Sequence, residues 1–211
     1  KIAAGGRTGI RMLEDMGLQF SHREGFGEEY DLGKEGGHSR RRVLHVGDFT
    51  GREIMRVLID RVRRESSIEL RENLMAIDLI TLSWLGLVGE NRCIGAYFLD
   101  RASGEILAVR AQNTVLAAGG AGKIYLYTSN PDTATGDGVA MAWRTGLPVR
   151  NMEFVQFHPT CLYHPEAKSF LISEALRGEG GRLINAAGES FTERFDARGS
   201  LAPRDIVARA I

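Results

Sequence analysis

An apolar run that ends in a glycine-rich turn constrains the fold of this chain most. Residues Asn113–Ala118 are predicted to form a buried strand, and the sequence Ala-Ala-Gly-Gly-Ala-Gly at 117–122 follows as a tight turn. A short helix is then predicted at Asp137–Arg144, with Gly146 at its C-terminal end. A strand, a turn and a helix in this order are typical of an α/β protein.

The other periodic segments add helices and a β-rich insert to this α/β pattern. A helix is predicted over Ile2–Met16, closed by Gly17, and a second helix begins at the capping box Thr50-Gly51-Arg52-Glu53. A third begins near Pro203, before the apolar residues Ile206 and Val207. The segments predicted as strands of the insert are Glu69–Leu82, Cys93–Asp100 and Glu105–Arg110, with Arg101–Gly104 as a turn.

Composition excludes several classes of protein. The 211 residues carry a formal net charge of zero, so no global field recruits nucleic acid or an anionic membrane. Glycine occurs 26 times, which favours close approach of backbone to a nucleotide cofactor. The two cysteines, Cys93 and Cys161, have no metal or redox spacing, and no apolar run is long enough to span a membrane, so a cytoplasmic location is expected.

Both ends of the sequence have the character of internal positions. Lys1 is not an initiator methionine, and the chain stops about two turns into the helix expected after Pro203. We therefore expect a fragment of a longer protein. No stretch completes G-x-G-x-x-G, so the phosphate-binding fingerprint of a dinucleotide domain is absent from this sequence.

Several short motifs resemble functional sites but lack residues that those sites require. Gly120–Lys123 lacks the upstream glycine and the following Ser or Thr of a P-loop. The five histidines show no paired spacing for a metal, so no metal site is predicted. The run Arg40-Arg41-Arg42 has no interleaved aromatic residues and is interpreted as a solvated face.

The chemistry is concentrated in Glu153–Gly181 and Leu201–Asp205. These segments hold an imidazole, a hydroxyl next to a carboxylate, and a guanidinium: His158, Ser173, Glu174 and Arg204. Arginine offers a planar fork that matches a carboxylate, and histidine and serine add hydrogen-bond donors. The set suits binding of a small dicarboxylate and movement of a proton beside it.

Four segments carry a resemblance to the flavoprotein family of L-aspartate oxidases, succinate dehydrogenases and fumarate reductases. They are Ala117–Gly146, Asn151–Pro165, Ile172–Gly181 and Leu201–Ile211. Upstream, Lys34–Ile54 resembles the aspartate oxidase branch in particular. The resemblance implies part of a Rossmann-like FAD-binding domain with a β-rich insert over residues 1–153. It also implies the start of an α+β capping or substrate domain over residues 154–211.

The resemblance also implies roles for individual residues. Arg204 matches the family's proton-transferring arginine, and Glu35 is the residue specific to the aspartate oxidase branch, where it would meet the substrate ammonium. Residues that match the lining of the dicarboxylate site are Gln156, His158, Ser173 and Glu174. Residues that match contacts to FAD are Met75, Ala76, Gly119, Gly120 and Asp137. From pattern alone, Gly119-Gly120 is equally a plain turn and Asp137 equally a helix N-cap.

The implied reaction is oxidation of L-aspartate to iminoaspartate by FAD, with dioxygen or fumarate as acceptor, the first step of NAD biosynthesis. Quinolinate synthase would act downstream. The resemblance also implies that the phosphate-binding fingerprint lies N-terminal to this segment, so the segment alone is expected to bind FAD weakly and to be inactive. Two alternatives remain open: the flavoprotein subunit of a succinate dehydrogenase or fumarate reductase, and a folded piece without catalysis of its own.

Overall fold

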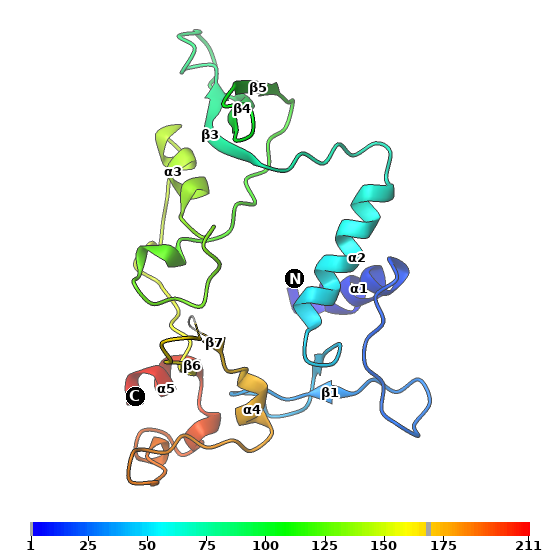
Figure 1. Ribbon diagram of the computed structural model, residues 1–211, viewed down its shortest axis with the longest axis vertical. Coiled ribbons are helices and arrows are strands. Elements are labelled where there is room, and N and C mark those ends of the chain that lie inside the picture. The colour runs from blue at the N-terminus through cyan, green and yellow to red at the C-terminus, as the bar shows by residue number, and fades with distance from the viewer. Residues whose placement is uncertain (1, 168–169) are drawn as a thin grey trace. The chain divides into compact units, whose positions relative to one another are not determined.

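The computed structural model describes residues 2–167 and 170–211, and Figure 1 shows its elements in chain order. The chain packs as two compact units that each combine separate segments. The first unit holds residues up to Leu70 together with Phe157–Thr160 and Ile172–Ile211, and the second holds Arg71–Gln156 and Cys161–Leu171. The expected boundary between residues 153 and 154 stays a prediction.

The second unit contains an antiparallel sheet of three strands (Figure 1). Its order is β3 (Leu74–Thr81), β4 (Cys93–Asp100) and β5 (Ile106–Arg110). The bounds of β4 and the turn after it are as predicted from the sequence, and β5 begins one residue late. The predicted strand Glu69–Leu82 is too long, because Asn73 has a φ of 62° that interrupts extended backbone before β3 begins.

Helix α3 (Asp137–Arg144) covers this sheet with Met141, which is buried against Leu79 and Ala96. The Arg144 guanidinium joins α3 to β3: its Nε donates to Asp78 Oδ2 at 2.7 Å, and its Nη2 donates to the Ile77 carbonyl at 3.0 Å. The bounds of α3 agree with the sequence prediction. Three smaller elements complete the unit: a 3-10 turn η1 (Gly122–Ile124) and the two-residue strands β6 (Cys161–Leu162) and β7 (Phe170–Leu171).

The strand predicted at Asn113–Ala118 is wrong. These residues adopt no regular secondary structure, and Val115 is 85% exposed. An extended segment becomes a strand only when its backbone donors and acceptors pair with a neighbour. Among the described residues, no strand pairs with this segment.

Two helices and a short β-ribbon build the N-terminal part of the first unit. Helix α1 (Ile2–Asp15) ends at Gly17, whose φ of 102° lets the Leu18 amide donate back to the Leu13 carbonyl at 2.9 Å. Strands β1 (Leu32–Gly33) and β2 (Val43–Leu44) pair antiparallel. Leu18 and Phe20 are buried together with Val57 of α2 (Thr50–Arg64).

The capping box predicted before α2 is also wrong. Thr50 is already the first helical residue, and its hydroxyl accepts from the Val46 amide at 3.0 Å. The Glu53 carboxylate instead accepts from Arg56 Nε at 2.8 Å. Each side chain therefore has a competing partner, and the helix begins after Phe49 without a side-chain cap.

The C-terminal part of the first unit consists of short helical turns. Its elements are α4 (Glu174–Gly178), η2 (Thr192–Arg194), η3 (Gly199–Leu201) and α5 (Arg204–Ala210). Pro203 precedes α5 as its N-cap rather than standing at the first helical position. The expected apolar face of this helix buries Val207. Among the described residues, no helix combines the length and the apolar character needed to cross a bilayer.

Candidate active site

Helix α4 carries the carboxylate around which the candidate site is built. Ser173 caps this helix, because its Oγ accepts from the Ala175 amide at 3.2 Å. Glu174 occupies the first turn and is only 6% exposed. A buried carboxylate is costly unless charged donors satisfy it.

Two arginines satisfy the Glu174 carboxylate, one on each oxygen. Arg177 Nη2 donates to Oε1 at 2.7 Å, and Arg204 Nε and Nη2 both lie 2.6 Å from Oε2. Two guanidinium groups on one carboxylate leave a net charge of +1 at this place. Arg204 is the outer partner, since its side chain is 33% exposed whereas that of Arg177 is 4% exposed. The cluster can therefore offer a positive group to an anionic ligand while its inner half stays buried.

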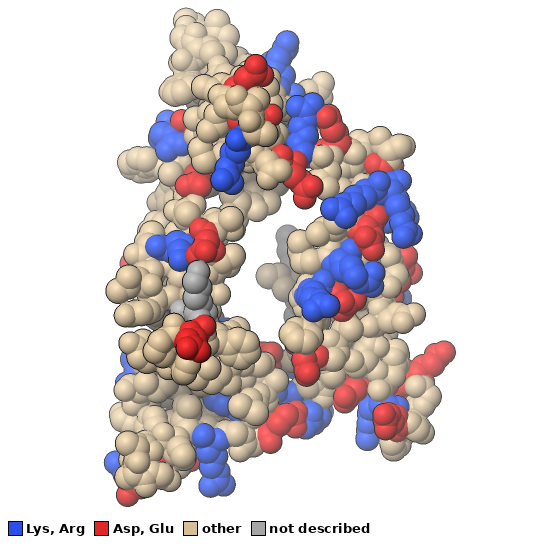
Figure 2. Space-filling model, viewed as in Figure 1, with Lys and Arg blue, Asp and Glu red and all other residues tan. Residues whose placement is uncertain are grey.

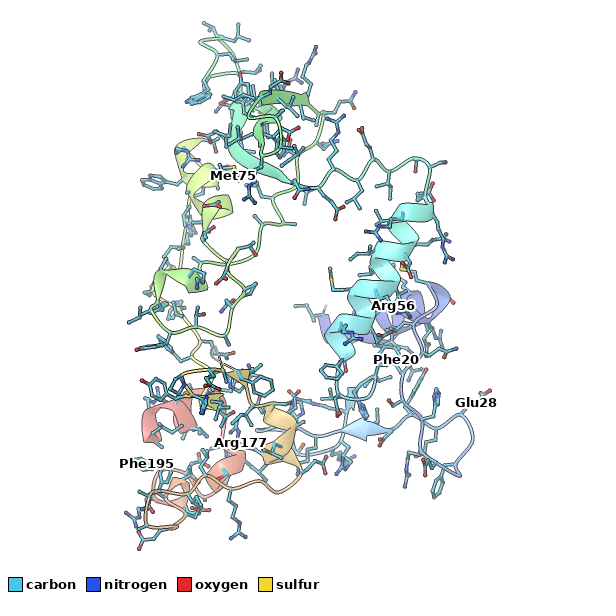
Figure 3. The ribbon with its side chains drawn as sticks, viewed as in Figure 1. Phe20, Glu28, Arg56, Met75, Arg177 and Phe195 are labelled. Atoms are coloured by element: carbon cyan, nitrogen blue, oxygen red, sulfur yellow. The ribbon has the colours of Figure 1, made fainter. Side chains whose placement is uncertain are left out.

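Arg177 fastens this cluster to the segment before α5. Its Nη1 donates to the Ser200 carbonyl at 2.9 Å and lies 3.4 Å from the Ala202 carbonyl. Figure 3 labels Arg177 beside α4. Sequence reasoning does not single out this residue, although a Glu and an Arg three positions apart on a helix are a recognisable pair. What the sequence does not indicate is that the pair is buried.

The ring of His158 has a defined hydrogen-bonding state. Its Nδ1 lies 3.2 Å from the Thr160 amide, which can only donate, so Nδ1 accepts. The Thr160 hydroxyl is itself held by the Ile172 carbonyl at 3.0 Å. The pKa of His158 is lowered, first by burial and then by the nearby Arg204 guanidinium. A neutral ring with an Nε2–H donor follows, and this donor suits a carboxylate oxygen.

The turn that carries Glu35 lies directly against α4. A Cβ placed on Gly36 would stand 2.7 Å from Glu174 Oε1, and one placed on Gly178 would stand 1.8 Å from the Lys34 carbonyl oxygen. The Gly37 amide also donates to the Leu201 carbonyl at 2.7 Å. The turn can therefore pack this closely against α4 only because residues 36 and 178 are glycines without a Cβ. Glu35 is partly exposed, and its carboxylate makes no hydrogen bond within the described part of the chain.

The structure thus groups four of the predicted residues in the first unit. His158, Ser173, Glu174 and Arg204 belong to it with the backbone of Glu35. Ser173 uses its oxygen as a helix cap and keeps its own O–H for another acceptor. Gln156 belongs to the second unit and is exposed. The catalytic and substrate-binding roles of all these residues stay predictions.

The residues predicted to contact FAD all belong to the second unit. Met75 and Ala76 lie on β3, where Figure 3 labels Met75. Gly119 and Gly120 lie in the loop before α3, and the Gly120 carbonyl accepts from the Gly136 amide at 3.2 Å. Asp137 begins α3 and accepts from the Thr135 hydroxyl at 2.8 Å. Gly136, with a φ of 84°, is the N-cap, so the N-cap alternative for Asp137 is wrong.

These positions fit a flavin nucleotide chemically. A Cβ on Gly119 or Gly120 would meet nothing within 4 Å, so the loop presents open backbone to a ligand. The Asp137 carboxylate is exposed and can accept from a ribose or ribityl hydroxyl.

Within residues 2–167 and 170–211, no group of three potential metal ligands gathers. In Figure 2, acidic and basic side chains are interspersed over the visible surface.

Comparison with known proteins now adds to this geometry. Residues 2–211 match the family described as FAD binding domain. The chain belongs to this family of FAD-binding domains. It is 57% identical over 211 residues to an L-aspartate oxidase of Pseudomonas aeruginosa, covering 97% of this chain and 39% of that protein. It is 55% identical over 210 residues to L-aspartate oxidase 1 of Ralstonia nicotianae, covering all of this chain and 39% of that protein.

Solved structures resemble the chain as well. A structure described as quinol-fumarate reductase with menaquinol molecules has a TM-score of 0.84 at 29% identity, covering 96% of this chain and 35% of that one. Mycobacterium smegmatis Sdh1 in complex with UQ1 has a TM-score of 0.69 at 34% identity, covering 99% and 35%. The chain therefore has the FAD-binding fold of these flavoproteins, and it spans about two fifths of the length of the oxidases it matches.

Proposed function

We propose that this chain is part of a FAD-dependent L-aspartate oxidase, which converts L-aspartate to iminoaspartate with dioxygen or fumarate as acceptor. Sequence similarity supports this choice within the family. The named L-aspartate oxidases are 43–57% identical to the chain, whereas the similar reductase and Sdh1 structures are 29–34% identical. The single structural observation that supports a dicarboxylate site is the Glu174 carboxylate shared by Arg177 and Arg204, and the choice of L-aspartate rests on the sequence identities.

The proposed division of labour is by sequence range and differs from the two compact units, each of which combines separate segments. Residues 1–153 would form a portion of a Rossmann-like FAD-binding domain with the β3–β5 insert, and residues 154–211 the start of an α+β capping domain. Met75, Ala76, Gly119, Gly120 and Asp137 would hold FAD, mainly through backbone groups and one carboxylate. When bound, the flavin supplies an acceptor for the hydride that leaves the substrate Cα.

The protein groups would bind and orient an amino dicarboxylate. Arg204, the Nε2–H of His158 and the Ser173 hydroxyl would be donors for its two carboxylates. Gln156 is also proposed as a substrate-binding residue. Glu35 would accept from the ammonium group, which succinate does not have. The ammonium must first lose one proton to water. As the Cα–H bond then breaks, the nitrogen lone pair forms the C=N bond, and the resulting iminium loses a second proton to water to give the imine. Arg204, hydrogen-bonded to Glu174, would transfer the proton at the substrate carbon when fumarate is reduced.

The flavoprotein subunit of a succinate dehydrogenase or fumarate reductase is the second candidate. The TM-score of 0.84 to a quinol-fumarate reductase favours it at the level of fold. The dicarboxylate grip around Glu174 serves either reaction, since both substrates carry two carboxylates. The ammonium of aspartate is the difference, and the Glu35 carboxylate is the proposed partner for it.

The test uses the full-length protein loaded with FAD and mixed anaerobically with L-aspartate or with succinate. We expect L-aspartate to bleach the flavin absorbance and to yield oxaloacetate and ammonia after hydrolysis of the imine. We expect succinate to reduce the flavin at least about 100-fold more slowly, because a site built for a charged partner rejects the analogue that lacks it. Reduction by succinate and not by L-aspartate would establish the second candidate instead.

The wider setting stays a proposal too. An enzyme of this kind would begin NAD biosynthesis, and quinolinate synthase would consume its unstable imine product. A cytoplasmic location agrees with the two free cysteines, Cys93 and Cys161.

A further inference from the structure

We infer that Arg41 and Glu179 form a positioning pair that sets the direction of Glu35 and thereby the selectivity for an ammonium-bearing dicarboxylate. This inference rests on the proposed function, in which Glu35 meets the substrate ammonium. Arg41 belongs to the run Arg40–Arg42, whose sequence pattern indicates only a solvated face. In the structure this one arginine has a defined partner next to the active-site helix.

The contact between the two side chains is a double hydrogen bond. Arg41 Nη1 lies 2.7 Å from Glu179 Oε1, and Arg41 Nη2 lies 2.6 Å from Glu179 Oε2. Two parallel bonds from a planar guanidinium to a planar carboxylate fix both distance and orientation. The pKa of the Glu179 carboxyl is lowered, chiefly by this hydrogen bond.

Arg41 also holds the other end of the turn that carries Glu35. Its Nη1 donates to the Leu32 carbonyl at 3.2 Å, three residues before Glu35. Glu179 comes directly after α4, the helix that presents Glu174. One guanidinium therefore connects the chain that enters the Glu35 turn with the C-terminal end of the active-site helix.

The backbone of the turn is held from two sides. On one side, the Gly37 amide donates to the Leu201 carbonyl at 2.7 Å. On the other, Lys34 and Glu35 rest on Gly178, where an added Cβ would be 1.8 Å from the Lys34 oxygen and 3.2 Å from the Glu35 Cα. On this second side the backbone of Lys34 and Glu35 contacts Gly178 closely, and the Arg41–Glu179 pair adds hydrogen bonds next to that contact. The Glu35 carboxylate has no hydrogen bond of its own to described residues, so its direction depends on this backbone.

An exposed ion pair contributes little to global stability, and these side chains are 53% and 50% exposed. The effect of the pair is therefore expected in selectivity rather than in folding. Arg40 provides a matched control, since it is an exposed arginine of the same run and has no hydrogen bond to described residues.

The experiment uses the full-length FAD-loaded enzyme and compares L-aspartate oxidation with fumarate reduction. We expect Arg41→Gln and Glu179→Gln each to lower kcat/KM for L-aspartate about tenfold, mostly through KM, because a supporting contact is lost while the reacting groups stay. Fumarate reduction, flavin content and melting temperature should change little, and Arg40→Gln should resemble the unmodified enzyme. The exchanged pair R41E with E179R restores the ion pair but not the hydrogen bond to the Leu32 carbonyl, so it should recover the selectivity in part.

Glu35→Gln separates the inference from the proposed function. If Glu35→Gln fails to damage aspartate oxidation selectively, this result contradicts the recognition role of Glu35. It then also contradicts the positioning role of the Arg41–Glu179 pair. If Glu35→Gln is selective but Arg41→Gln behaves as Arg40→Gln does, the positioning pair alone is overturned. Equal losses on aspartate and fumarate in Arg41→Gln would also overturn it. Combining Arg41→Gln with Glu35→Gln should add no further loss, since both act through one carboxylate.

Discussion

The sheet of the second unit and the charged cluster on α4 are both buried, but by opposite means. Leu79, Ala96 and Met141 bury apolar surface, and their contacts come from neighbouring strands and one helix. Glu174 and Arg177 bury charge, at 6% and 3% exposure, and need each other to do so. Apolar burial is non-directional and tolerates repacking, whereas a buried ion pair fails when one partner is removed. The packing of the sheet therefore tolerates substitution, whereas the charged cluster depends on each of its partners.

The largest effect is expected where one charge of the cluster loses its partner. Arg177→Met should destabilise the structure around α4 and α5 by about 3–5 kcal/mol, because it leaves the Glu174 carboxylate with only Arg204 and removes the donor to the Ser200 carbonyl. Hydrogen exchange of the α4 and α5 amides in the full-length protein measures this. The exposed Arg182 provides the control, and Arg182→Met should change little. Equal protection in both variants would mean that the cluster adds no stability.

A smaller effect is expected in the sheet. Met141→Ala removes a side chain that is 2% exposed and should cost about 2–5 kcal/mol, through lost transfer energy and the cavity left behind. Hydrogen exchange should detect it in β3 and β4, while the α4 amides keep their protection. Met152→Ala is the matched control, because the Met152 side chain is 53% exposed and its removal should change protection little. Loss of protection at α4 as well would show that the two regions unfold together and that their burial is not independent.

The smallest effect concerns the protonation of His158. Its pKa in the folded protein is lowered by burial and by Arg204, so the folded state favours the neutral ring. This stabilisation is complete above the unfolded pKa of about 6.5 and is lost as the pH falls through the lower folded pKa. Stability should therefore decrease below about pH 6.5 more in the unmodified protein than in His158→Gln. Nitrogen NMR of the ring should find the hydrogen on Nε2. A hydrogen on Nδ1 would contradict the hydrogen bond that Nδ1 accepts from the Thr160 amide.

Local patterns predict the elements whose stability is local. Strand β4 and helix α3 have the predicted bounds, because apolar spacing and the flanking turn residues define each within a few positions. Gly17 and Gly146 have the positive φ values of 102° and 82° that helix ends favour. The capping box at Thr50 shows the limit of such patterns, since both of its side chains have other partners.

The candidate site can be predicted only in its residue types. Histidine, glutamate and arginine in motifs indicate dicarboxylate chemistry, and the structure groups His158, Glu174 and Arg204 in one unit. The contacts that set their geometry join residues far apart in sequence. Arg41 meets Glu179 across 138 positions, and Gly36 packs against Glu174. No periodicity or spacing encodes such contacts. For the same reason, the apolar pattern predicts a strand at 113–118 where no partner strand pairs with it among the described residues.

The most direct test of the charged cluster as the working centre is Arg204→Leu in the full-length FAD-loaded enzyme, followed by stopped flow. Arg209→Leu, on the same helix and in an exposed ion pair with Asp205, is the control. We predict that the Arg204→Leu enzyme retains its flavin but that L-aspartate reduces this flavin about 100-fold or more slowly, with reoxidation unchanged, because the substrate carboxylate is no longer positioned. An unchanged rate of flavin reduction by L-aspartate would contradict the account.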